Sequence, residues 1–209
     1  MTAREAGILV VDVQNGFLSE PDELPVPGGV EVVPIINALL PRFAVRIASQ
    51  DWHPRNHGSF ASQHPGAKPY DQGSLAGLPQ TLWPDHCVQG TEGAALHKDL
   101  GIPHAELIIR KGYRPHMDSY SAFAEADGKT PTGLTGYLRD RGLTRVFLAG
   151  LATDFCVAWS ALDARKAGFY AAVIEDACRG IDVGGSLAKA WQDMLGAGVM
   201  RLQSTDLDV

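Results

Sequence analysis

The 209-residue chain is 45% hydrophobic and carries a formal net charge of −6. This acidic balance argues against nucleic acid or an anionic membrane surface as partner, and no apolar stretch approaches the roughly 20 residues that a membrane span needs. The length suits one large domain, and we predict a single domain over residues 1–209 because no linker or internal repeat divides the sequence.

Strand-like and helix-like segments alternate along the chain. The strand-like segments are short apolar runs, and the helix-like segments carry apolar residues at helical spacing. In chain order we predict strands over 8–13, 43–49, 106–109, 146–149, 170–174 and 199–202, and helices over 30–40, 134–141, 154–167 and 186–195. This alternation predicts an α/β fold, a three-layer α/β/α sandwich around a central six-stranded parallel sheet.

A long irregular segment over about residues 51–93 separates the second predicted strand from the third. It is rich in proline, glycine and histidine, and it contains the aromatic residues Trp52, Phe60, Tyr70 and Trp83. A long loop inside a compact domain is usually functional or disordered, and this one is too aromatic for a disordered linker. We therefore predict an ordered loop that forms part of a site.

Polar residues stand at the carboxyl ends of several predicted strands, where parallel sheets bind their ligands. Among them Cys156 is a candidate nucleophile, because Lys111 would stabilise its thiolate and Asp12 would take its proton. The predicted helix start at Cys156 should lower the thiol pKa and also hold an oxyanion. Each residue alone has an ordinary structural interpretation, so only the shared sheet edge predicts this group.

A second candidate group belongs to the long loop. Asp51 and His53 are two residues apart, so their side chains point the same way on an extended segment, and His86 could join them. One carboxylate and two imidazoles suit a divalent zinc, iron or manganese ion, with positions left for water or ligand. His57 would be a further ligand or a partner behind one. The alternative is that these histidines hydrogen-bond the loop backbone, because their spacing matches no recognised zinc motif.

The sequence contains three cysteines, whose spacing indicates no disulfide framework and favours a reducing compartment. Residues 1–7 lack the basic start and apolar core of a signal peptide. We therefore expect a cytoplasmic protein, and a homo-oligomer remains open. Cys87 and Cys178 are interpreted as structural, because strand-like alternation turns Cys87 away from its neighbour His86 and Cys178 has no evident activator.

Several segments also carry a family resemblance. They are Asp-Val-Gln-Asn-Gly-Phe at 12–17, Asp-Trp-His-Pro at 51–54, Trp-Pro-Asp-His-Cys-Val at 83–88, Arg-Lys-Gly at 110–112 and Gly-Leu-Ala-Thr-Asp-Phe-Cys-Val at 150–157. In this order they resemble nicotinamidases, which belong to the isochorismatase-like cysteine hydrolases. The segments at 51–54 and 83–88 are similar to the metal-containing nicotinamidase branch in particular.

The resemblance implies the isochorismatase-like hydrolase fold and an amidohydrolase of NAD salvage. Such an enzyme would convert nicotinamide to nicotinate and ammonia through a thioester on Cys156, and would also accept pyrazinamide. The resemblance implies that Asp12, Lys111 and Cys156 form the catalytic group. It further implies a cis peptide at Leu151-Ala152, with the amides of Ala152 and Cys156 forming the oxyanion hole.

The resemblance also implies a cofactor and a substrate pocket. One divalent metal ion would bind Asp51, His53 and His86, and zinc is favoured over iron or manganese. We hypothesise that the pyridine nitrogen of nicotinamide binds this ion. The residues that the resemblance places around the pyridine ring are Phe17, Trp83, Tyr120 and Phe155.

Two other functions compete with this hypothesis. A metal-free cysteine hydrolase of the same superfamily would act on another small amide or ureide, but it leaves the loop histidines without a role. A metal-binding or redox-sensing module would use the histidines and Cys156 without turnover, but it gives Asp12 and Lys111 no task. A nucleotide-binding protein is disfavoured, because no glycine-rich phosphate motif follows the first strand.

Overall fold

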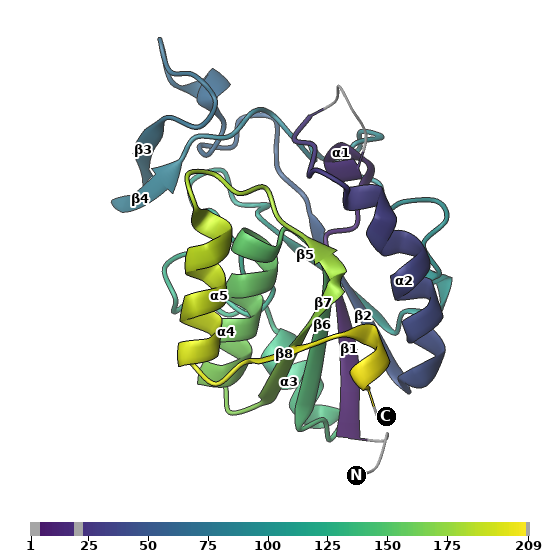
Figure 1. Ribbon diagram of the computed structural model, residues 1–209. Coiled ribbons are helices and arrows are strands. Elements are labelled where there is room, and N and C mark those ends of the chain that lie inside the picture. Colours follow the sequence, from purple (N-terminus) through teal and green to yellow (C-terminus); the bar gives the residue numbers. More distant parts are fainter. Residues whose placement is uncertain (1–4, 19–22, 208–209) are drawn as a thin grey trace.

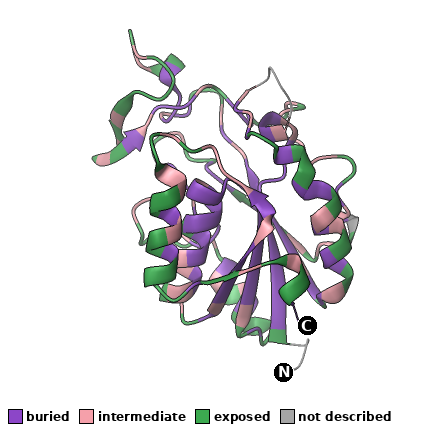
Figure 2. Ribbon diagram, viewed as in Figure 1, coloured by how far each residue is buried: buried purple, intermediate pink, exposed green. Residues whose placement is uncertain are grey.

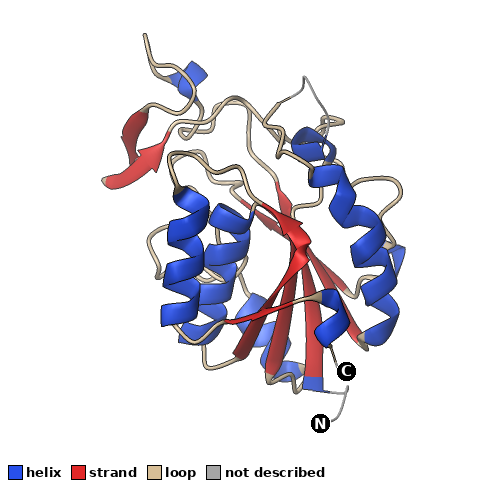
Figure 3. Ribbon diagram, in the orientation of Figure 1, coloured by secondary structure: helices blue, strands red, loops and turns tan. Residues whose placement is uncertain are grey.

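The computed structural model describes residues 5–18 and 23–207, which form a six-stranded sheet with the order β5-β2-β1-β6-β7-β8. Every neighbouring pair in this sheet is parallel. The strands are β1 (Ala6–Val11), β2 (Val45–Asp51), β5 (Leu107–Lys111), β6 (Arg145–Leu151), β7 (Tyr170–Arg179) and β8 (Met200–Leu202). The predicted α/β sandwich is confirmed, since helices cover both faces of the sheet (Figure 3).

The helices divide between the two faces (Figure 1). The short α1 (Asn15–Leu18) and α2 (Val32–Leu39) lie on one side, and α3 (Leu134–Asp140), α4 (Ala158–Lys166) and α5 (Ser186–Gly196) lie on the other. Alternate residues of β1 serve the two cores: Ile8 packs in the cluster beneath α2, and Leu9 packs in the cluster beneath α3 to α5. Burial on both faces explains why the strands read as continuous apolar runs (Figure 2).

Several predicted boundaries are wrong at polar strand ends. β2 begins at Val45 rather than at residue 43, and it continues to Asp51, which therefore lies in the sheet and not in the loop. β7 extends five residues beyond the predicted end at 174, to Arg179, after a register shift against β6. Apolar periodicity does not detect these extensions, because polar residues such as Gln50, Asp51, Glu175 and Asp176 interrupt the apolar pattern, although Ala177 and Cys178 return to the core.

The long loop contains an antiparallel hairpin that the sequence did not predict, formed by β3 (Gln72–Leu75) and β4 (Leu78–Thr81). It projects away from the sheet (Figure 1). Its turn residues Ala76 and Gly77 have φ angles of 52° and 78°, so both adopt the left-handed conformation that two-residue hairpin turns require. The strands are short and largely polar, which explains why no alternating pattern marked them.

The predicted helix over 154–167 is also divided in two. A single wide helical turn spans Thr153–Val157, and the regular helix α4 begins only at Ala158. Cys156 therefore lies in the wide turn that joins β6 to α4. Among residues 5–18 and 23–207, no helix is long and apolar enough to cross a membrane.

Candidate active site

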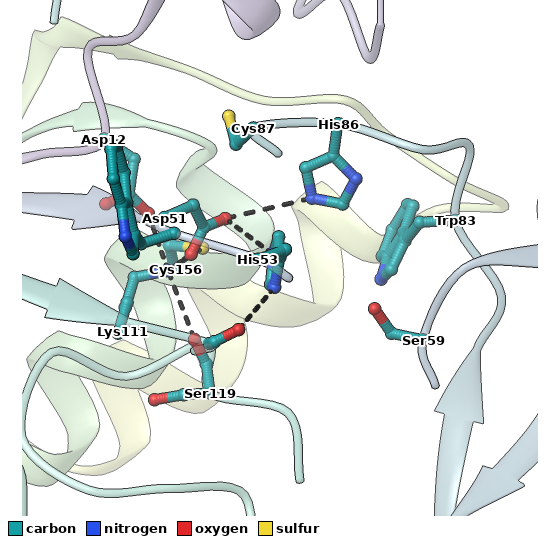
Figure 4. A network of polar contacts seen from close by, with 12 residues as sticks. Asp12, Asp51, His53, Ser59, Trp83, His86, Cys87, Lys111, Ser119 and Cys156 are labelled. Atoms are coloured by element: carbon teal, nitrogen blue, oxygen red, sulfur yellow. Dashed lines mark hydrogen bonds and ion pairs between the residues drawn. The ribbon is translucent and has the colours of Figure 1, made fainter. Parts of the chain in front are cut away.

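The predicted catalytic residues meet at the carboxyl edge of the sheet (Figure 4). Asp12 directly follows β1, Lys111 is the last residue of β5, and Cys156 follows β6. Lys111 Nζ lies 2.8 Å from Asp12 Oδ2 and donates a hydrogen bond of 3.2 Å to Cys156 Sγ. The ammonium group thus contacts both of the other two members of the group.

Lys111 is fully buried and surrounded by acceptors. Its Nζ pairs with the Asp51 carboxylate as well as with Asp12, and it donates to the Ser119 carbonyl at 3.1 Å. Burial alone would lower the pKa of Lys111, but the carboxylates of Asp12 and Asp51 outweigh it and raise that pKa well above its ordinary value. The lysine is therefore a permanent positive charge beneath the site.

Asp12 is placed to exchange a proton. Its backbone has a φ of 49°, its Oδ1 accepts a hydrogen bond of 2.6 Å from Ser49 Oγ, and its Oδ2 forms the ion pair with Lys111. The contact with the Lys111 ammonium uses one lone pair of Oδ2, and a carboxylate oxygen has a second lone pair that can take a proton. Burial raises the pKa of Asp12 above its ordinary value, although Lys111 opposes that shift. A raised pKa suits a group that accepts and returns a proton.

The thiol of Cys156 differs from the sequence-based expectation. Burial raises the pKa of Cys156 well above its ordinary value, and the Lys111 ammonium offsets this only in part. The expected lowering of the thiol pKa by a helix start is therefore wrong. At neutral pH the resting residue is a thiol, so its attack requires a proton acceptor such as Asp12. The cis peptide Leu151-Ala152 is present, and Ala152 lines the same pocket as Cys156.

The predicted metal ligands converge on the outer side of the same cluster. His53 Nε2 lies 3.5 Å and His86 Nε2 lies 3.9 Å from Asp51 Oδ2. The other ring nitrogen of each histidine is anchored: His53 Nδ1 lies 2.8 Å from the Gly112 carbonyl, and His86 Nδ1 lies 2.8 Å from the Pro84 carbonyl. In the neutral tautomer that donates to these carbonyls, both Nε2 lone pairs face the Asp51 carboxylate.

This donor set fits a divalent cation. Ligand atoms of Asp51, His53 and His86 lie within 4.8 Å of one another, and the carbonyl-anchored imidazoles match the usual arrangement behind a metal ligand. Burial and the neighbouring His53 lower the pKa of His86 to about 4, which keeps it neutral and able to ligate. For His53, burial is outweighed by Asp51, which raises the pKa of that ring. A bound cation would take the place of the proton that Asp51 attracts.

His57 is placed behind His53 rather than beside the other ligands. The two rings lie 4.4 Å apart, and His57 Nδ1 is 2.7 Å from Ser59 Oγ, while its Nε2 is 3.3 Å from the Met117 carbonyl. His57 could also share an ion with His53 and Asp118 by distance. However, both of its ring nitrogens already have partners, so we assign it a supporting position.

The predicted aromatic residues line one pocket together with Cys156 and the metal-ligand candidates. Trp83 and Phe155 meet at right angles with ring centroids 4.9 Å apart, and Trp83 Nε1 donates to the Tyr120 hydroxyl at 2.9 Å. Such a pocket suits a flat aromatic ligand. The lining includes the four predicted residues Phe17, Trp83, Tyr120 and Phe155, and also Leu24, Asp118 and Ile181, which the sequence did not indicate.

Two further supporting residues were missed although a signal was available. Gln14 accepts a hydrogen bond of 2.7 Å from the Asp51 N–H and donates one of 2.9 Å to the Asp51 carbonyl, so its amide fixes the backbone of a candidate ligand. Ser49 supports Asp12, as described above. Ser49 lies two residues before Asp51 in β2, so period-2 alternation places it on the site face. For Gln14 the signal is its place just after the carboxyl end of β1, next to Asp12.

Comparison with known proteins finds relatives that cover nearly the whole chain. Residues 6–204 match the isochorismatase domain family. A nicotinamidase of Acinetobacter baylyi is 53% identical over 205 residues, which cover 98% of this chain and 95% of that protein. A solved structure of an Acinetobacter baumannii nicotinamidase/pyrazinamidase matches with a TM-score of 0.95 at 55% identity, covering 97% of this chain and 98% of that one.

Two other solved structures contain ligands. PnC1 of L. infantum, in complex with nicotinate, matches with a TM-score of 0.86 at 37% identity over 98% of this chain and 95% of that one. The pyrazinamidase of Pyrococcus horikoshii, in complex with zinc, matches with a TM-score of 0.77 at 34% identity over 95% of this chain and 99% of that one.

Proposed function

Because the chain belongs to the isochorismatase family, we propose that it is a metal-dependent cysteine amidohydrolase that converts nicotinamide to nicotinate and ammonia. One observation carries the proposal: Cys156, with Lys111 and Asp12 behind it, lines one aromatic pocket together with Asp51, His53 and His86. The nicotinamidase names of the relatives and the nicotinate complex support this substrate. Pyrazinamide, a similar flat ring amide, is a second expected substrate.

The proposed reaction begins with the substrate ring between the aromatic side chains and its carboxamide carbon at Cys156 Sγ. Asp12 accepts the thiol proton as the sulfur attacks the carbonyl carbon. The backbone amides of Ala152 and Cys156 stabilise the tetrahedral oxyanion, at about 3 kcal/mol for each donor in comparable sites. Lys111 balances the negative charge that the sulfur and the carboxylate share during the transfer.

Collapse of this intermediate breaks the carbon–nitrogen bond. Asp12 returns its proton to the leaving nitrogen, so ammonia departs and a thioester remains on Cys156. A water molecule that gives its proton to Asp12 then attacks the thioester, and the carbon–sulfur bond breaks. Nicotinate leaves, and Asp12 reprotonates the thiol. One residue therefore serves as base and acid in turn.

Asp51, His53 and His86 would hold the metal ion. When bound, the ion supplies a Lewis-acidic position for the pyridine nitrogen, which orients the ring. Zinc is the proposed ion because two imidazoles and one carboxylate are typical zinc donors and because a relative was solved with zinc. A cytoplasmic location and a homo-oligomer stay predictions of the sequence.

Ammonia release from nicotinamide by the purified protein tests the proposal. The metal-replete, reduced protein should release ammonia, and prior chelation should abolish the release until zinc, iron or manganese is returned. Metal analysis of the same sample separates this enzyme from a metal-free relative. If the metal-replete protein hydrolyses another small amide but releases no ammonia from nicotinamide, nicotinamide is not the substrate.

A further inference from the structure

The segment that carries His86 is held through the backbone of the next residue, Cys87. Cys87 has a φ of 47°, a left-handed conformation that non-glycine residues seldom adopt. Its carbonyl accepts a hydrogen bond of 3.1 Å from the His53 N–H, and the Gln89 N–H donates to the His53 carbonyl at 2.9 Å. The two histidine-bearing segments are therefore joined at Cys87.

The N–H of Cys87 has a charged partner from a distant part of the chain. It donates a hydrogen bond of 2.7 Å to Glu23 Oε2, across 64 positions of sequence. Cys87 is fully buried with Glu23 in place, so its N–H depends on this acceptor within the folded chain. Glu23 thus holds Cys87, which directly follows His86 and whose carbonyl bonds the His53 N–H.

The Glu23 carboxylate occupies a fitted space between two glycines. A Cβ on Gly93 would lie 2.1 Å from Glu23 Oε1, and a Cβ on Gly16 would lie 2.3 Å from Glu23 Oε2. The Gly16 N–H donates to the Gly93 carbonyl at 2.9 Å, which ties the two glycines together. Any larger residue at either position would displace the carboxylate, so these glycines and Glu23 form one unit.

We propose that Glu23 is a positioning residue for the metal site: its hydrogen bond to the Cys87 N–H sets the geometry of the His86 and His53 ligands. This inference rests on the metal ion of the proposed function. Partners behind metal ligands commonly change metal affinity by about 10- to 100-fold when they are removed. The effect is assigned to the hydrogen bond that Glu23 Oε2 accepts rather than to the charge of the carboxylate, and Glu23→Gln separates the two.

A competition titration of the metal-free protein with Zn²⁺ against a chromophoric chelator tests the role directly. Glu23→Ala should weaken Zn²⁺ binding by about 10- to 100-fold. Glu23→Gln, whose amide oxygen can still accept the bond, should stay within about threefold of the native affinity. The matched control is Glu92→Ala. The exposed Glu92 carboxylate lines the same surface hollow as Glu23, but it accepts a hydrogen bond of 2.9 Å from Asn15 Nδ2 rather than one from Cys87. This control should bind Zn²⁺ like the native chain.

A second variant displaces the carboxylate without removing it. Gly93→Ala places a methyl group against Glu23, and all three atoms nearest to that methyl belong to Glu23. It should weaken Zn²⁺ binding as Glu23→Ala does, and the double variant should be no weaker than either single one. If Glu23→Ala does not fold, Gly93→Ala decides the question alone. Native Zn²⁺ affinity in either folded variant overturns the role of Glu23, as does a native chain that binds no Zn²⁺.

These results are independent of the proposed reaction. A native chain that binds Zn²⁺ in a Glu23-dependent manner but does not hydrolyse nicotinamide retains the positioning role and loses the proposed substrate. A native chain that hydrolyses nicotinamide, with Zn²⁺ affinity unchanged in Glu23→Ala, retains the substrate and loses the positioning role.

Discussion

The active site joins two regions that the chain builds differently. The carboxyl edge of the sheet supplies Asp12, Lys111 and Cys156 from the ends of three parallel strands, whereas the irregular loop supplies His53 and His86. Within the first set, Lys111 is held by strand register beside Asp51, and Asp12 and Cys156 lie in the turns that follow β1 and β6. The second set depends on single hydrogen bonds from ring nitrogens and loop amides to carbonyl groups. In the proposed function, the sheet edge therefore supplies the reacting groups, and the loop histidines bind the cation together with Asp51 of β2.

Asp51 connects the two regions because it ends β2 at the point where the loop begins. Its Oδ1 pairs with Lys111, and its Oδ2 faces His53 and His86. Burial would raise the pKa of Asp51, but Lys111 and His53 outweigh it and hold that pKa well below its ordinary range. The carboxylate therefore stays ionised and faces both Lys111 and the two histidines. A substitution in one region should leave the structure of the other region intact.

The largest effect is expected from Cys156→Ala. Loss of the nucleophile should reduce ammonia release by about 10⁵-fold or more, because no other group can form the thioester. Metal content, measured by atomic absorption, should stay native, since Cys156 is not among the proposed ligands. Cys178→Ala is the matched control, because Cys178 is also a buried cysteine that forms no disulfide. This variant should retain activity. Ammonia release at a comparable rate by the Cys156 variant would remove it as nucleophile.

The complementary change is His53→Ala in the loop. It should lower metal affinity by more than the roughly 100-fold expected for a supporting partner, because a direct ligand is lost. The far-UV circular dichroism spectrum should stay native, which would show that the sheet persists. His64→Ala is the control: this loop histidine bonds the Gly58 carbonyl at 2.8 Å and is not among the proposed ligands. A full equivalent of metal in purified His53→Ala would exclude His53 from the site.

The two regions also differ in how far the sequence predicted them. The strand-end group could be inferred because apolar runs mark the strands, and parallel strands bring their carboxyl ends to one edge. The loop histidines gave only a residue set that suits a metal, and the resemblance to nicotinamidases selected among the alternatives. Asp118 lies in an irregular segment with no periodicity, so nothing in the sequence indicated that it lines the pocket.

Burial explains the remaining differences. The sequence predicted a lowered pKa for Cys156 from local features, the helix start and a nearby lysine. The raised pKa follows from burial of the thiol among residues of the sheet, α4 and the aromatic pocket, which depends on packing between distant segments. Similarly, β4 has few apolar residues. Its one buried residue, Gln80, donates to the hydroxyl of Tyr120, which lines the pocket.

A smaller effect is expected on the pH dependence of kcat/KM. Because Asp12 must be ionised to accept the thiol proton, activity should fall as the pH drops through its pKa, which burial raises above the ordinary value of 3.8. The Ser49 hydroxyl stabilises the ionised form, so Ser49→Ala should move the acidic limb upward by roughly one pH unit. Metal content measured at each pH separates this limb from protonation of the histidines.

Ser160→Ala is the control for that profile. Ser160 is equally buried, but its hydroxyl accepts a hydrogen bond from the Ala122 N–H at 2.9 Å rather than bonding a carboxylate. Its acidic limb should coincide with that of the native enzyme. An acidic limb that stays in place or moves downward in Ser49→Ala would show that Asp12 does not set it.

The smallest effect concerns the hairpin, which belongs to the loop and contacts residues that line the aromatic pocket. Gln80 Nε2 lies 2.8 Å from Asp118 Oδ2 and 3.0 Å from the Tyr120 hydroxyl, which also accepts the Trp83 N–H. Gln80→Ala should raise KM for nicotinamide by about 2- to 10-fold, the worth of one such bond, with kcat and metal content nearly native. Gln72→Ala on the exposed face of β3 should change neither constant.

The division of this effect between KM and kcat decides what the hairpin is. A rise in KM alone would show that Gln80 supports the residues of the pocket wall. It would then act neither in metal binding nor in proton transfer. A fall in kcat with native KM would instead show that the orientation of Tyr120 or Asp118 matters to the reacting carboxamide. If kcat and KM are both unchanged, the hairpin has no role in substrate binding or turnover. The loop would then contribute to catalysis only through the metal ligands.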